Sequence, residues 1–269
     1  MRVNGLRSVA RRVVPARAKP VVSRLYRTVR SKPWRKSRLW LTIPRLGWRI
    51  VCPCCRLRFR SLLTYRGRVN AVCPWCGAME RHRLLALYLR HRTEFLSAPM
   101  SLLHVAPEAS VQRVLRRNRN LNYVDIDLNH PIPERRMDLT DLRFDDDVFD
   151  GILCSHVLEH IVDDRQAMRE LCRVLKPTGL ALVLVPQNMD LESTFEDPTV
   201  TSPDDRARLF GQSDHVRVYG LDFQQRLRAA GFNVELEKYI ELLPESVVRR
   251  HALRRSFIYR CTKPAAAIH

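Results

Sequence analysis

Acidic residues are missing from the first 79 positions of this 269-residue chain, and Glu80 is the first. The same stretch carries 20 of the 47 lysines and arginines, so nearly all of the net charge of +19 belongs to it. The remaining residues hold 27 basic and 28 acidic groups. The sequence therefore predicts a near-neutral globular body with a cationic N-terminal part, and not a uniformly basic protein.

Long apolar runs are also missing. No uncharged apolar run reaches the ~18 residues that a membrane-spanning helix needs, and no apolar core of about 7–15 residues marks a secretory signal. Eight cysteines are too few for a disulfide scaffold in a chain of this length. Because 45% of the residues are hydrophobic, a packed core is expected. These features predict a cytoplasmic protein with one ordinary domain and a small module.

Residues 1–50 contain 15 basic side chains and are expected to form a basic amphipathic or flexible segment. Within it, residues 21–30 combine helically spaced apolar residues with an arginine face, and Trp34, Trp40 and Trp48 follow. This pattern favours contact with an anionic membrane surface at the inner face of the membrane. A nucleic-acid backbone, a disordered tail and an organelle-targeting peptide remain as alternatives.

Two pairs of cysteines follow, Cys52 with Cys55 and Cys73 with Cys76, in the pattern C-x2-C-x17-C-x2-C. Two residues between thiolates allow one turn to direct both sulfurs at one ion, and four thiolates close a tetrahedral structural zinc site. Cys54 could replace Cys55 as a ligand. The sequence predicts a zinc ribbon over residues 51–79, with redox pairs or free thiols as the alternative.

Residues 80–99 are expected to link the ribbon to the next domain through a helix at 80–96 whose arginines are solvated. From 100 to 269, strand-like and helix-like runs alternate. Strands are expected at 101–106, 122–126, 149–154, 179–185, 233–241 and 255–261, and helices at 111–117, 165–175 and 221–230. This order predicts an α/β fold with a doubly wound, mostly parallel, Rossmann-like sheet.

Polar residues follow several of these strands, where ligands of such sheets bind. Asp127 follows the second strand, where a carboxylate can accept hydrogen bonds from both hydroxyls of a ribose. Asp138 ends another short element, where it could accept a hydrogen bond from an adenine amino group. Ser155 and His156 follow the strand at 149–154, where a reacting group would be presented.

The stretches VFDGIL (148–153), VLEH (157–160) and LCRVLKPTG (171–179) resemble those of class I S-adenosylmethionine-dependent methyltransferases of the type 11 kind. The resemblance covers about 100–240 and implies S-adenosylmethionine as cofactor. It also implies that Asp127 binds the ribose, that Asp138 and Leu139 contact the adenine, and that Ser155 and His156 line the site of methyl transfer. The ribbon followed by this domain also resembles bacterial methyltransferases found with surface-glycan synthesis genes.

The first loop departs from the family pattern, because residues 103–110 read LHVAPEAS and contain no glycine. Ala106 is small enough for close approach of a ligand but takes a positive φ less readily than glycine. Glu108 is a candidate anchor for the cofactor's amino group. The G-x-G-x-x-G pattern of a nicotinamide enzyme is absent, which disfavours a dehydrogenase.

His156 and His215 are candidate catalytic bases, because histidine suits proton removal from a hydroxyl. His215 lies in residues 187–220, which we expect to be an irregular lid or acceptor-binding loop whose acids would repel a polyanion. Base methylation lacks its N-P-P-Y signature, so O-methylation of a sugar, glycan, glycolipid or other small hydroxyl acceptor is predicted. The alternatives are a zinc-ribbon RNA methyltransferase and a non-catalytic adapter that retains the fold.

Overall fold

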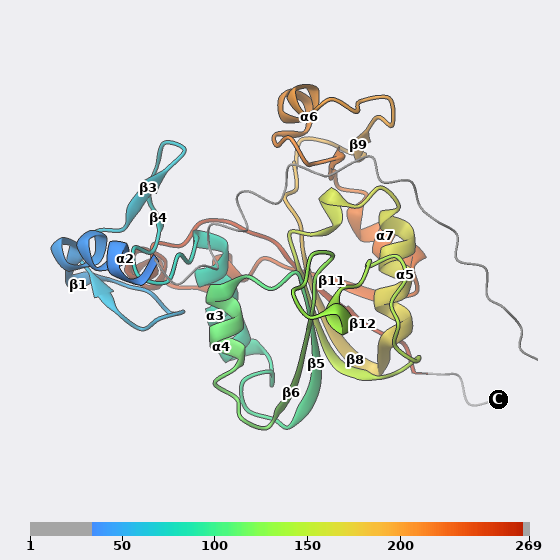
Figure 1. Cartoon of the computed structure of the whole chain (residues 1–269), viewed down its shortest axis with the longest axis horizontal. Coiled ribbons are helices and arrows are strands. Elements are labelled where there is room, and N and C mark those ends of the chain that lie inside the picture. The colour runs from blue at the N-terminus through green and yellow to red at the C-terminus, as the bar shows by residue number, and fades with distance from the viewer. Residues whose placement is uncertain (1–33, 266–269) are drawn as a thin grey trace, which may run out of the picture. The chain divides into compact units, whose positions relative to one another are not determined.

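A six-stranded sheet with the order β11-β12-β8-β7-β5-β6 forms the centre of the fold (Figure 1). The computed structural model describes residues 34–265, and the amphipathic stretch at 21–30 lies outside them. The strands of this sheet are β5 (Met100–Val105), β6 (Leu121–Ile126), β7 (Phe149–Ser155), β8 (Leu175–Leu184), β11 (Asn233–Glu237) and β12 (Ile258–Thr262).

Four neighbouring strands, β5 to β8, are parallel, whereas β12 is antiparallel to both β8 and β11. The strands follow the apolar runs of the sequence, because a strand buried on both faces needs apolar side chains throughout. The prediction of a doubly wound, mostly parallel α/β sheet is confirmed. The helices around it are α3 (Glu80–Arg92), α4 (Ala109–Leu115), α5 (Asp164–Val174), α7 (Phe223–Ala229) and α8 (Glu245–His251).

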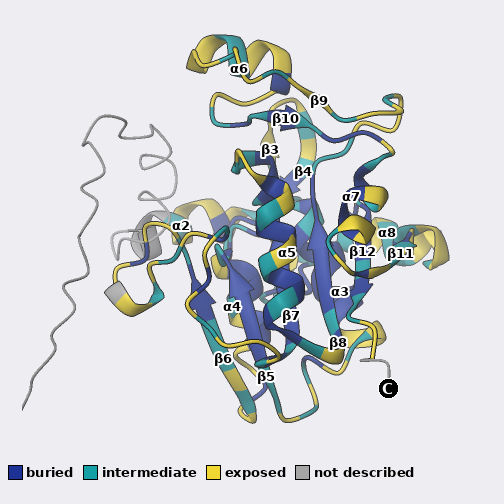
Figure 2. Ribbon diagram, turned by 90° about the vertical axis from the view of Figure 1, so that its right-hand side faces the viewer, coloured by how far each residue is buried: buried dark blue, intermediate teal, exposed yellow. Residues whose placement is uncertain are grey.

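Helices cover both faces of the sheet, with α3 and α4 on one side and α5 and α7 on the other (Figure 1). Successive strand residues point to opposite faces. Ile152 packs in a cluster with Met168 of α5, and its neighbour Leu153 packs in a second cluster with Leu84 of α3. Figure 2 shows the strands buried between these layers. An apolar core therefore packs on each face of the sheet. The ends of the strands lie outside these two cores, and ligands of such sheets bind there.

The segment between β6 and β7 departs from regular structure. It contains the short helix η2 (Pro133–Arg135) and two isolated bridges, Asp127 with Arg136 and Asp138 with Asp141. Among the described residues, no strand lies outside β6 at this end of the sheet. The loop therefore runs back beside the end of β6 and brings polar residues to its carboxyl end.

A small module precedes the sheet and consists of α2 (Trp34–Thr42), η1 (Ile43–Arg45), β1 (Leu46–Val51), β2 (Arg58–Phe59), β3 (Leu63–Tyr65) and β4 (Arg68–Val72). β3 and β4 form a hairpin between the cysteine pairs, and Gly67 takes a φ of 74° in its turn. β1 pairs with β2, so the strand pairing of the module reaches back to Leu46. Three of the six residues of β1 are exposed.

The linking helix α3 ends at Arg92 rather than at Leu96, because the Oγ1 of Thr93 donates a hydrogen bond to the carbonyl of Leu89. The prediction that its arginines are solvated is wrong for Arg83, which is completely buried. The guanidinium of Arg83 donates to five carbonyls of the module and of the end of α8: Asn70, Ala71, Ala78, His251 and Ala252. Arg83 thus joins three parts of the chain.

Residues 187–220 are not the irregular loop that the sequence predicts. They contain β9 (Phe195–Glu196), α6 (Pro203–Phe210) and β10 (Arg217–Val218), and β9 pairs with β10. Ser202 caps α6 and Gly211 ends it with a φ of 85°. The insertion lies beyond the end of β8, and α6 is mostly exposed (Figures 1 and 2). Among the described residues, no helix combines the length and apolar character of a membrane-spanning segment.

Candidate functional site

The carboxyl ends of the adjacent strands β5 and β7 carry two backbones in the left-handed region. Ala106 follows β5 with a φ of 44°, and His156 follows β7 with a φ of 55°. Each is held by its neighbour: the amide of Ala106 donates to Ile126, and that of His156 donates to Leu184, both at 2.8 Å. Such conformations cost about 1–3 kcal/mol each and cluster at ligand-binding sites. The carboxyl ends of β5 and β7 are therefore a candidate ligand-binding site.

Glu108, in the loop after β5, is buried and lies among polar partners. Its Oε1 accepts a hydrogen bond from Ser155 at 3.0 Å and faces His82 at 3.4 Å, and its Oε2 faces His104 at 3.6 Å. Burial would raise the pKa of Glu108, but the neighbouring imidazoles of His104 and His82 outweigh it and hold the pKa well below its usual range. Oε2 is buried and makes no hydrogen bond at its separation of 3.6 Å from His104.

Asp127 and Asp138 lie at the carboxyl end of β6. The backbone bridge between Asp127 and Arg136 sets the loop beside Asp127, and Asp138 follows shortly after. One oxygen of Asp127 accepts from the amide of Asn129 at 2.7 Å. The Oδ1 of Asp138 accepts from the amide and hydroxyl of Thr140. Asp138 is exposed and Leu139 is buried. The two carboxylates border the same loop, and these hydrogen bonds use one oxygen of each.

His156 leads into a cluster of titratable groups on the short helix η3 (Leu158–His160). Its Nδ1 lies 3.4 Å from Oε1 of the fully buried Glu159. Burial would raise the pKa of Glu159, but the hydrogen bond and charge of His156 lower it, so the carboxylate is ionised. The Nε2 of His156 and the Oε2 of Glu159 make no hydrogen bond.

His215 joins the same cluster from the insertion. Its ring lies against that of His160, with centroids 4.8 Å apart and planes at 82°. The amide of Val216 donates to the carbonyl of Glu159 at 2.9 Å, which fastens the insertion to η3. Burial lowers the pKa of His215, so its ring is neutral. The structure thus brings the two predicted catalytic histidines together through Glu159 and His160.

Beside this cluster lies a cavity of about 280 Å³ beyond the end of β8. His215 lines it together with Gln187 and Asn188, which follow β8, and with Gln212 of the insertion. Arg66 also lines it, from the turn of the β3–β4 hairpin. The small module therefore contributes a cation to a hollow at the carboxyl edge of the sheet.

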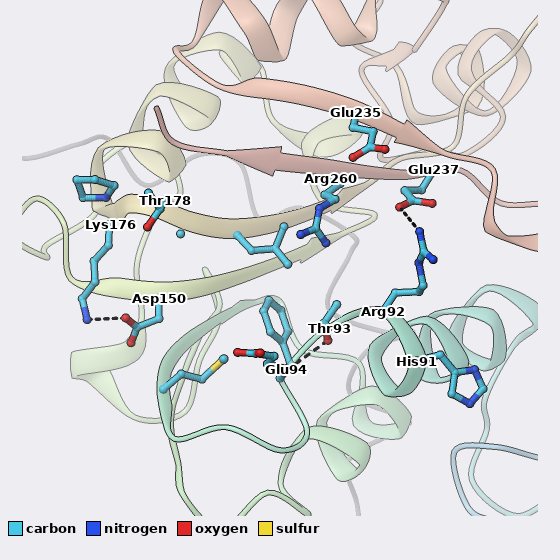
Figure 3. A pocket seen from close by; sticks show the side chains of 15 residues that line it. His91, Arg92, Thr93, Glu94, Asp150, Lys176, Thr178, Glu235, Glu237 and Arg260 are labelled. Atoms are coloured by element: carbon cyan, nitrogen blue, oxygen red, sulfur yellow. Dashed lines mark hydrogen bonds and ion pairs between the residues drawn. The ribbon is translucent and has the colours of Figure 1, made fainter. Parts of the chain in front are cut away.

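A second hollow of about 800 Å³ lies near the amino ends of β5, β7 and β8 and is bordered by the end of α3 (Figure 3). Four of its charged groups form two ion pairs: Lys176 lies 2.7 Å from Asp150, and Arg92 lies 3.4 Å from Glu237. This hollow is the larger of the two, but it lies at the amino ends of the strands, whereas ligands of a parallel sheet bind at the carboxyl ends. We therefore place the candidate site at the carboxyl edge.

The four predicted cysteine ligands also come together. The Sγ atoms of Cys52 and Cys76 are 3.6 Å apart, those of Cys55 and Cys73 are 3.7 Å apart, and all four lie within 4.8 Å of one another. Bonds of about 2.3 Å in a tetrahedron separate sulfurs by about 3.8 Å, so the cluster has the size of a zinc site. Cys54 lies outside it and contacts the carbonyl of His82. Cys154, Cys172 and Cys261 are buried thiols.

The sequence did not predict Glu159 and His160 as residues of the site. A signal existed, since His156, Glu159 and His160 follow a buried strand at close spacing, a position where such folds present reacting groups. Of the acids of the insertion, Glu196 pairs with the guanidinium groups of Arg217 and Arg226.

Parts of the chain are similar to known methyltransferases. Residues 94–183 match a family model described as a methyltransferase domain. The chain is 48% identical over 46 residues to the demethylmenaquinone methyltransferase of Clavibacter sepedonicus, which covers 17% of this chain and 19% of that protein. It is 31% identical over 91 residues to the enzyme of the same name from Mycolicibacterium paratuberculosis, covering 33% and 40%. The chain thus spans less than half the length of either relative.

Among solved structures, the 1,6-didemethyltoxoflavin-N1-methyltransferase of Burkholderia thailandensis, with bound S-adenosylhomocysteine, superimposes with a TM-score of 0.45. The two chains are 16% identical, and the match covers 67% of this chain and 76% of that one.

Proposed function

We propose that this chain, whose residues 94–183 form a methyltransferase domain of the class I kind, methylates a hydroxyl group of a sugar-like acceptor with S-adenosylmethionine as the donor. The observation that carries the proposal is that the candidate site residues lie at one edge of the sheet. Two strained backbones, the carboxylates of Asp127 and Asp138 and the histidine cluster all occur at the carboxyl ends of adjacent parallel strands. A ligand of this fold binds there.

The residues at this edge fit the cofactor. Asp127 would accept hydrogen bonds from the ribose hydroxyls, and Asp138 with the amide of Leu139 would hold the adenine. Ala106 lets the backbone come close to the ligand, and the unpartnered Oε2 of Glu108 suits the cofactor's amino group. Ser155 keeps Glu108 oriented through its hydrogen bond. When bound, S-adenosylmethionine supplies a methyl group on a positively charged sulfur.

Methyl transfer to oxygen needs alignment and removal of one proton. The acceptor oxygen forms a bond to the methyl carbon while the carbon–sulfur bond breaks, and the hydroxyl proton leaves to a base. We assign that base to His156, whose Nε2 is unpartnered and whose Nδ1 faces the ionised Glu159. Glu159 stabilises the positive charge that the ring gains. His215 acts on the acceptor side, since it lines the adjoining cavity.

The cavity supports a polar acceptor. Its amides, Gln187, Asn188 and Gln212, can bind hydroxyl groups, and Arg66 favours an acceptor that also carries an anionic group. A glycan or a glycolipid offers both. A quinone precursor offers hydroxyls but little for Arg66 to bind.

The test is to incubate the purified full chain with radiolabelled S-adenosylmethionine and separate glycolipid, polysaccharide, quinone and RNA fractions. We expect label in a carbohydrate-bearing fraction, and none there when Asp127→Ala replaces the wild type. Label confined to RNA or to quinones would overturn the acceptor. A chain that binds no S-adenosylmethionine would overturn the transferase assignment and favour an adapter.

The cysteine cluster supports a structural zinc ion bound by Cys52, Cys55, Cys73 and Cys76, because four thiolates leave no open position for catalysis. Its purpose would be to hold the hairpin that carries Arg66. We expect Cys55→Ser to lower the zinc content, measured by mass spectrometry, by one ion per chain. The neighbouring Cys54→Ser should retain zinc, and loss of zinc in that variant alone would contradict the ligand assignment.

The module also supports a surface partner. Trp40 and Trp48 are 83% and 82% exposed, and Arg58 lies over the Trp48 ring. Exposed tryptophans beside arginines suit the headgroup region of an anionic membrane. We expect the full chain to sediment with phosphatidylglycerol vesicles and to lose this in a Trp40→Ala, Trp48→Ala double variant. Binding to RNA with a steep salt dependence, in place of vesicles, would contradict the membrane assignment.

A further inference from the structure

The cluster at the end of β7 contains three potential metal ligands besides His156, the proposed base. One ligand atom from each of Glu159, His160 and His215 lies within 4.8 Å of the other two. Glu159 and His215 are 1% and 4% exposed. The Oε2 of Glu159 and the Nε2 of His215 are buried and make no hydrogen bond. An unpartnered buried polar atom costs about 1–3 kcal/mol, so two in one place require an explanation.

The hydrogen bonds around the two rings fix which nitrogen is free. The Nδ1 of His215 lies 3.0 Å from the carbonyl of Phe210, and the Nδ1 of His160 lies 3.2 Å from the carbonyl of Asp214. A carbonyl can only accept, so each Nδ1 carries a proton, and Nε2 is the nitrogen of each ring that can bind an ion. Metal-binding histidines are oriented in this way, by a second bond from the other ring nitrogen.

The three ligands lie close together. The Nε2 of His160 lies 3.9 Å from Oε1 of Glu159, and the His215 ring packs edge-to-face on that of His160. Bonds of about 2.1 Å in a tetrahedron separate two ligand atoms by about 3.4 Å. The pair of His160 and Glu159 is therefore about 0.5 Å too wide for an ion, and all three ligand atoms already lie within 4.8 Å of one another.

We propose that Glu159, His160 and His215 bind a divalent transition-metal ion that holds the acceptor hydroxyl. Two imidazoles and one carboxylate suit Mn²⁺, Fe²⁺, Co²⁺ or Zn²⁺ and leave coordination positions open. His215 also lines the cavity of about 280 Å³, so the proposed ion would lie beside it. An ion there lowers the pKa of a bound hydroxyl, and His156 then accepts its proton. This inference rests on the proposed methyl transfer and narrows the acceptor to one that offers a metal-binding oxygen.

The test measures metal and not activity. The full chain is dialysed against Mn²⁺, Co²⁺ or Zn²⁺ in turn, and bound metal is counted by mass spectrometry. We expect the wild type to bind one ion more per chain than His215→Ala. If the variant still binds the ion at higher metal concentration, we expect its affinity to be at least about tenfold lower than that of the wild type. Glu159→Gln, which preserves the shape of the side chain, should show the same loss. His91→Ala serves as the matched control, since His91 contacts Tyr239 on another part of the molecule.

Binding of S-adenosylmethionine by calorimetry, on the same samples, separates the two claims. Variants that lose the ion but still bind S-adenosylmethionine support the site and show that the fold persists. Equal metal content in wild type, His215→Ala and Glu159→Gln for all three metals overturns the site even when S-adenosylmethionine binds. Metal binding without S-adenosylmethionine binding leaves the site standing and overturns the transferase assignment.

Discussion

Single residues at the carboxyl edge depart from what their types prefer. The first loop has no glycine, yet the backbone after β5 still takes the left-handed conformation, at Ala106 with a φ of 44°. The sequence indicated that this loop approaches a ligand but not that an alanine would adopt the conformation. The reason is the neighbouring strand, which fixes the Ala106 amide by a hydrogen bond to Ile126.

Ala106→Gly should stabilise the protein. The left-handed conformation costs an alanine about 1–2 kcal/mol, and the greater freedom of glycine in the unfolded chain offsets part of the gain. We expect a net increase of about 0.5–1 kcal/mol in the free energy of unfolding, measured by chemical denaturation. Ala109→Gly, at the start of α4, is the control and should lower it. A destabilised Ala106→Gly would show that the backbone strain is not released.

Arg83 shows where sequence patterns fail at the residue scale. An arginine on a helix with other arginines reads as solvated, but its five carbonyl acceptors come from residues 70–78 and 251–252. No local pattern contains that information, because the partners are brought together by the fold. Burial lowers the pKa of Arg83, and negative charge at Cys52 and Glu80 opposes this effect.

Arg83→Lys should destabilise the module and its junction with α8. A lysine offers three donors at one point and cannot reach five carbonyls. We expect a loss of about 3 kcal/mol or more in the free energy of unfolding, together with earlier release of zinc on heating. Arg90→Lys, on the exposed side of the same helix, should change neither quantity. Equal stability of the two variants would refute a joining role for Arg83.

At the scale of elements, buried ion pairs hold the insertion to the helices α5 and α7. Asp164 accepts a hydrogen bond from the Tyr219 hydroxyl at 2.8 Å and lies 3.2 Å from Arg226 and 3.8 Å from Arg217. Both arginines also contact Glu196 of β9. These pairs position β10, and with it His215, beside η3.

Asp164→Asn should therefore loosen the insertion before the sheet unfolds. Removing one partner of a buried pair costs about 3 kcal/mol. We expect faster limited proteolysis within residues 188–216 and weaker acceptor binding, with S-adenosylmethionine affinity unchanged. Asp205→Asn alters only exposed contacts with Arg208 and Ser202 and should leave proteolysis unchanged. Unaltered proteolysis in Asp164→Asn would show that the insertion is held elsewhere.

At the scale of the whole molecule, the mostly parallel sheet follows from the sequence. The apolar runs at β7 and β8 and the alternation with helices predicted the sheet, and the cysteine spacing predicted the cluster. The partners of Glu159 and His160 could not be predicted, because His215 approaches them from an insertion about 55 residues away in the chain. Such long-range pairings depend on how the insertion folds, which local patterns do not encode.

The most direct test of the account is calorimetric titration of the purified full chain with S-adenosylmethionine. We expect saturable binding of one molecule per chain. Asp127→Ala should weaken it by roughly 10–100-fold, since a carboxylate hydrogen bond is worth about 1.5–3 kcal/mol, while the exposed Asp145→Ala should bind like the wild type. A wild-type chain that gives no binding heat, or an Asp127→Ala variant with unchanged affinity, would contradict the central claim.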